Sequence, residues 1–136
     1  MSTRKVVITT LIVVSGILFA CSKSNTLVKI LGTWERVNVT TVNADIIEDW
    51  LFSVDDIFLI TQYHRDNPDS LTYRNEGRYT VKVKFFKRYV TIKGFSGGDS
   101  YLNDDWEIVR SNKSILILVS AKGGGLEIRE FTKRKF

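Results

Sequence analysis

Apolar and polar residues alternate along most of the chain after residue 31. The clearest case places Tyr79, Val81, Val83 and Phe85 on one face of a segment, with basic residues and threonine on the other. Alternation with a period of two predicts a β-strand that has one buried face and one solvated face. Similar apolar, β-branched and aromatic segments predict strands at about 31–42, 50–54, 57–63, 79–85, 89–92, 106–109, 115–119 and 126–133.

Short segments rich in turn-forming residues separate these strands. Tight turns are expected at 55–56, 111–113 and 122–125, a hairpin loop at 65–70 and a mobile loop at 95–103. A single helical turn is expected at 43–49. Consecutive antiparallel strands with short connections favour an all-β fold, an up-and-down barrel of about eight strands. Closing the sheet also removes exposed strand edges.

The N-terminal segment has a different pattern. Arg4 and Lys5 precede an uncharged apolar run that ends at Ala20, which is typical of a secretory signal peptide. The run ends in Leu18-Phe19-Ala20-Cys21, which resembles the bacterial lipobox, in which the cysteine is acylated and becomes the new N-terminus. The resemblance implies a signal peptide at 1–20, a flexible lipidated tether at 21–30 and one domain at 31–136. The alternative is an ordinary secreted protein.

Composition agrees with one small exported domain. About 116 residues remain after the signal segment, enough to bury roughly 65% of the unfolded surface. Cys21 is the only cysteine, so core packing alone must hold the domain together. No other apolar run is long enough to span a bilayer, so the expected membrane contact is through acyl chains on Cys21. Neither an aspartate at position 22 nor an acidic run follows Cys21. By resemblance to bacterial lipoproteins, this implies the periplasmic side of the outer membrane.

Gly32-Thr33-Trp34 at the start of the first strand resembles the Gly-x-Trp signature of the lipocalins. The likeness extends over about 31–136, and the whole pattern resembles the small lipocalin-like lipoproteins of Bacteroidetes. It implies that Trp34 plugs the closed end of a barrel beneath a basic residue from the last strand, Arg134 or Lys133. Trp34 is out of phase with Val37 and Val39, so a bulge is expected between them.

A lipocalin-like barrel suggests a pocket for a small apolar ligand such as a fatty acyl chain. Two tyrosine hydroxyls would orient the polar group of that ligand. The predicted lining is Trp50, Phe52, Tyr63, Tyr79, Val81 and Val83. The alternative is a barrel filled by its own side chains, which would act as a structural or interaction module by binding an envelope protein or inhibiting an enzyme.

Catalytic, metal and cofactor sites are not predicted. His64 is the single histidine and has no second His or Cys to complete a ligand set. The pairs Asp55-Asp56 and Asp104-Asp105 fit turns, and Lys122 with three glycines lacks the remainder of a phosphate-binding loop. Basic residues at 82–93 alternate with aromatic ones, but an exported sheet with a solvated face explains them better than nucleic-acid binding. The chain is therefore not expected to be an enzyme.

Overall fold

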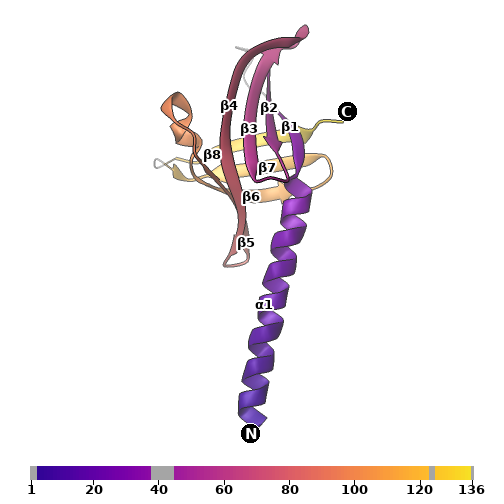
Figure 1. The fold of residues 1–136 in the computed structure, drawn as a ribbon, viewed down its shortest axis with the longest axis vertical. Coiled ribbons are helices and arrows are strands. Elements are labelled where there is room, and N and C mark those ends of the chain that lie inside the picture. Colours follow the sequence, from indigo (N-terminus) through magenta and orange to yellow (C-terminus); the bar gives the residue numbers. More distant parts are fainter. Residues whose placement is uncertain (1–2, 38–44, 123–124, 136) are drawn as a thin grey trace.

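The fold is known from a computed structural model that describes residues 3–37, 45–122 and 125–135 (Figure 1). A long helix, α1 (Thr3–Ile30), leads into a sheet. The strands are β1 (Gly32–Arg36), β2 (Ile46–Phe52), β3 (Ile57–His64), β4 (Asn67–Lys84), β5 (Lys87–Lys93), β6 (Asp105–Ser111), β7 (Ile115–Ser120) and β8 (Glu127–Lys133). A 3-10 helix, η2 (Gly97–Leu102), lies between β5 and β6.

The eight strands form one sheet that closes on itself. Each strand pairs antiparallel with its neighbours in sequence, and β1 also pairs with β8. Trp34 of β1 lies opposite Trp50 on one side and Lys133 on the other. The predicted all-β fold, with eight antiparallel strands in up-and-down order, is confirmed.

This topology gives the closed sheet two distinct ends. Because β1 runs away from α1 and the strands alternate in direction, the β2–β3, β4–β5 and β6–β7 turns lie at the end that carries α1. We call this end the base. The β3–β4, β5–β6 and β7–β8 connections lie at the opposite end, which we call the rim. Figure 1 shows α1 projecting away from the base.

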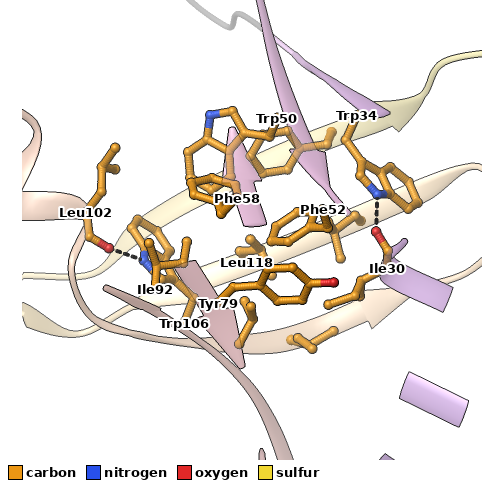
Figure 2. Close-up of a cluster of buried hydrophobic side chains, with 14 of the residues drawn as sticks. Ile30, Trp34, Trp50, Phe52, Phe58, Tyr79, Ile92, Leu102, Trp106 and Leu118 are labelled. Carbon is orange, nitrogen blue, oxygen red and sulfur yellow. Dashed lines mark hydrogen bonds between the residues drawn. The ribbon is translucent and has the colours of Figure 1, made fainter. Parts of the chain in front are cut away.

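Aromatic side chains fill the interior of the closed sheet (Figure 2). The register places Trp50, Phe52 and Phe58 on the same inward face as Trp34. Trp50 contacts Phe58 edge-on with ring centroids 5.0 Å apart, and Phe52 contacts Tyr79 in the same way at 5.1 Å. Among the described residues, the largest fully buried side chains are Ile30, Trp34, Trp50, Phe52, Phe58, Tyr79, Ile92, Leu102, Trp106, Leu116, Leu118 and Phe131.

The end of α1 seals the base, although residues 22–29 were predicted to be a flexible tether. They continue the helix, and Thr26 and Ile30 are buried while Leu27 packs against the core. The Trp34 indole donates a 2.7 Å hydrogen bond to the Ile30 carbonyl oxygen, one of the groups that a helix end leaves unpaired (Figure 2). The polar composition of the segment hid this, because only one helical face makes contact.

Two local predictions are wrong because strand pairing extends further than the sequence indicates. The segment 46–49 belongs to β2 rather than to a helical turn, while 38–44 lies outside the described residues. The hairpin loop expected at 65–70 is only the turn Arg65–Asp66, since β4 already begins at Asn67. Pro68 is tolerated because it lies at the start of a strand, next to register shifts near Tyr63 and His64.

The loop at 95–103 is packed rather than mobile. Phe95 and Leu102 are buried in the core, and the Asn103 side chain bonds both the amide and the carbonyl of Phe95. The Trp106 indole donates to the Leu102 carbonyl oxygen at 3.0 Å (Figure 2). This loop therefore closes part of the core at the rim.

The bulge expected after Trp34 is not needed. The pairing of β1 with β2 up to Glu35 and with β8 up to Arg36 shows no shift, and Val37 points outward with 40% of its surface exposed. Val39, which was part of the same expectation, lies outside the described residues. Phe85, predicted to continue the apolar face of its strand, instead lies in the β4–β5 turn and is exposed.

Candidate functional site

The residues predicted to line an apolar pocket form the core itself. Trp50 is 0% exposed, Phe52 and Tyr79 are each 1% exposed, and Val81 is 3% exposed. A side chain that lined a ligand-sized cavity would keep a water-accessible surface, and these four keep almost none. Val83 is half-buried near the end of β4. The four deepest residues therefore pack against other side chains where a ligand was expected.

The two tyrosine hydroxyls expected to orient a ligand are bonded to the protein. Tyr79 donates to the Ser53 carbonyl oxygen at 2.6 Å, and burial raises the pKa of Tyr79 to about 12, with Asp56 adding to the effect. Tyr63 points to the outer face of the sheet, where its hydroxyl donates to Asp49 Oδ2 at 2.9 Å. Both hydroxyls therefore donate their hydrogen bonds to groups of the protein itself.

The basic residue over Trp34 is Lys133 rather than Arg134. The Lys133 ammonium lies 4.3 Å from the centroid of the Trp34 ring and also donates to the Leu31 carbonyl oxygen. Burial lowers the pKa of Lys133. Arg134, the next residue along an extended chain, turns to the outside, where it lies 5.2 Å from the Tyr63 ring. The alternation of a strand thus decides between the two candidates.

A polar cluster that the sequence did not reveal lies inside the sheet toward the rim. Arg129 of β8 is 4% exposed, and its guanidinium lies 5.1 Å from the Trp50 ring and 5.4 Å from the Trp106 ring. Its Nε donates to Glu127 at 2.7 Å, and its Nη1 lies 3.7 Å from Glu48. The sequence did contain a sign of this cluster, because Glu127, Arg129 and Phe131 alternate on one face of the strand. The sign was weak, because two of these three residues are charged and a charged face is usually solvent-exposed.

Glu48 collects most of the remaining donors of this cluster. Its carboxylate accepts hydrogen bonds from the Trp50 indole and from Gln62, both at 2.8 Å, and Arg36 lies 3.5 Å away. Two arginines and two glutamates balance in charge, so the cluster has no net charge with which to hold an ionic ligand. We interpret it as a network of paired charges and hydrogen bonds that closes the core on the side of the rim. Buried charges are tolerated only when they are paired.

The remaining candidates for chemistry stay apart. Among the described residues, no three His, Cys, Asp or Glu side chains are placed to hold a metal ion. His64 is exposed at the end of β3. An open hollow of about 500 Å³ lies outside the sheet at the base, between α1 and the β6–β7 turn. Its lining is Val28, Lys29, Ser111, Asn112, Lys113 and Lys133.

Comparison with known proteins assigns the chain to no family. No protein-family model, curated protein or solved structure matches the chain. In the described part of the chain, no helix has both the length and the apolar character required to cross a bilayer. What can be argued about function therefore rests on the geometry above.

The carboxylate of Asp49, buried on the outer face of the sheet, has a raised pKa. Burial raises the pKa of Asp49 from 3.8 to about 6; Arg134, whose Nε lies 3.2 Å from Oδ2, opposes this, and Glu35 adds to it. Among the described residues Asp49 Oδ1 has no hydrogen-bond partner, so its ionised form is poorly solvated.

This shift predicts a pH dependence of folding. Between pH about 4 and about 6 the folded state binds the Asp49 proton more tightly than the unfolded state does, so the contribution of Asp49 to stability falls as pH rises through this window, by up to about 3 kcal/mol. Asp49→Asn should remove this component, and Asp55→Asn, in an exposed turn, should keep it. Urea unfolding from pH 4 to pH 7 measures the difference. A constant offset between Asp49→Asn and the native protein would contradict the assignment.

Proposed function

We propose that this protein is a lipid-anchored envelope module with a filled core, which works through its surface rather than by carrying an apolar ligand inside. The observation that carries the proposal is the absence of accessible surface on Trp50, Phe52 and Tyr79, the side chains that would have lined a pocket. Each packs edge-on against another ring, so side chains of the protein occupy the positions where an acyl chain was expected.

The two ends of the closed sheet support the same proposal. The base is closed by Ile30, Trp34 and Lys133, and the core on the side of the rim is closed by the paired charges around Arg129. The lipocalin resemblance remains a proposal about ancestry, which the position of Lys133 over Trp34 favours. Exposed apolar side chains at the rim are available to a protein partner: Leu71, Tyr101, Leu126 and Ile128.

The proposed anchor is an acylated Cys21. The cysteine is exposed on α1, one short helical stretch from the buried Thr26, so acyl chains there would hold the base toward the membrane. The rim, at the opposite end, would then face the envelope space. The polar residues after Cys21 favour the periplasmic side of the outer membrane.

The filled-core proposal predicts that no apolar ligand binds. The chain from Ser22 onward should carry no co-purifying lipid in native mass spectrometry and should show no saturable fluorescence with an apolar fluorophore. An acyl-chain-binding protein is the positive control. A bound lipid at unit stoichiometry, or saturable binding, would contradict the proposal and favour ligand transport.

The anchoring proposal predicts covalent lipid on one residue. Labelled palmitate should enter the native full chain produced in bacteria and should not enter Cys21→Ser, because Cys21 is the only thiol. Ser22→Ala is a matched control that should keep the label. Equal labelling of Cys21→Ser and the native chain would refute acylation at Cys21.

A further inference from the structure

The β4–β5 turn presents two phenylalanines to solvent. Phe85 is 83% exposed and Phe86 is 95% exposed. They are adjacent and form the tip of a hairpin in which Lys84 pairs with Lys87. Single exposed apolar residues are common on soluble proteins, but two neighbouring phenylalanines at a protruding tip require an explanation.

The backbone at this tip is unfavourable for phenylalanine. Phe85 has a φ of 50° and Phe86 a φ of 63°, so both occupy the left-handed region. A two-residue hairpin with positive φ at both positions strongly prefers Asn-Gly, and bulky side chains there reduce folding stability. The sequence thus retains two large apolar side chains where neither burial nor turn geometry favours them, which is a mark of a functional position.

The tip lies on the same side of the molecule as α1. Figure 1 shows the β4–β5 hairpin extending past the other strands in the direction in which α1 leaves the base, and α1 contacts β4. The β3–β4 pairing begins at Ile57 opposite Arg78, so β4 continues beyond the start of β3 by the six residues 79–84, and Phe85 follows in the turn.

Chain geometry puts the tip near the depth of Cys21. Six strand residues at a tilt of about 40° extend roughly 15 Å beyond the start of β3. The nine helical residues from Ile30 to Cys21 descend about 14 Å. If acyl chains on Cys21 enter a bilayer, Phe85 and Phe86 reach the same interfacial layer, which is roughly 5–10 Å deep for inserted apolar side chains.

Charges near the tip match a lipid surface. The Lys84 ammonium lies 5.6 Å from the centroid of the Phe85 ring, and Lys87 lies at the neck of the hairpin, 3.1 Å from Glu107. Lysines that flank aromatic residues favour the headgroup region, where the rings insert and the ammonium groups meet phosphates. Asp55 and Asp56 also lie at the base, but in the short β2–β3 turn that ends where β3 begins.

We propose that the β4–β5 tip is a second membrane contact: Phe85 and Phe86 insert into the bilayer surface beside the anchor at Cys21, and the flanking lysines bind lipid phosphates. The inference rests on the proposed anchoring, and it adds an orientation. Two points of contact fix the base against the membrane and hold the rim away from it, whereas a single anchor would leave the domain free to rotate.

The depth of the tip can be measured with one added tryptophan. The three native tryptophans are all 0% exposed, so a Trp introduced at position 86 is the only one that can meet lipid. The full chain, purified from membranes, is placed in vesicles of phosphatidylglycerol and phosphatidylcholine with or without brominated acyl chains. The emission of the added Trp, taken as the difference between Phe86→Trp and the native chain, should fall at least about twofold in brominated vesicles, because an interfacial Trp lies within reach of the bromines.

The matched control is Leu126→Trp, which replaces an exposed apolar residue at the rim. It should not be quenched. Equal emission changes for Phe86→Trp and Leu126→Trp would overturn the proposal, as would crosslinking of position 86 to an envelope protein without quenching by lipid. Anchoring is scored separately, by flotation of Cys21→Ser with vesicles, so failure of the anchor and failure of the hairpin contact give different results.

A second variant separates membrane contact from folding. Phe85→Asn combined with Phe86→Gly gives the preferred turn sequence, so the unfolding midpoint of the full chain should stay the same or rise. A lower midpoint would mean that the two phenylalanines serve the fold, and it would overturn the proposal.

Discussion

The indole of Trp34 ties the first strand to the helix that precedes it. Its Nε1–H donates to the Ile30 carbonyl, one face of its ring lies beneath the Lys133 ammonium, and its neighbours across the sheet are Trp50 and Lys133. Because β1 and β8 also pair at this point, one side chain joins the helix, the start of the sheet and its closure. The base is therefore sealed by a polar bond as well as by apolar packing, which leaves no unpaired donor on the buried indole.

A sealed base and an aromatic interior determine where function can reside. The core rings lie within contact distance of one another. The proposed function therefore relies on the rim, the outer faces and the β4–β5 tip. The same helix that seals the base carries Cys21, so the proposed anchor at this residue would be an extension of the helix rather than a loose tether. Under the two proposed membrane contacts, at Cys21 and at the β4–β5 tip, the base would face the membrane and the rim would face away from it.

The sequence predicted the strands well where one face is apolar and the other polar, as in Tyr79–Val83. It predicted poorly where contacts with distant residues decide the structure. Ile30 and Thr26 are buried only because the sheet closes beside them. Arg129 lies inside because its charge pairs with Glu48 and Glu127. Glu48 is distant in the sequence, and a charged Glu127 on the same strand face as Arg129 does not suggest that the face is buried. Periodicity places side chains on a face, but it does not show whether that face encloses a cavity or packed rings.

The unfolding free energy of Trp34 variants tests most directly the claim that the base of the domain is sealed through this residue. Trp34→Ala should lose about 3–5 kcal/mol, as for other buried aromatic truncations. Trp34→Phe, which keeps most of the ring but not the donor to Ile30, should lose less, about 1–2 kcal/mol. Leu126→Ala at the exposed rim should change little. A loss for Trp34→Ala below roughly 1 kcal/mol would contradict the account.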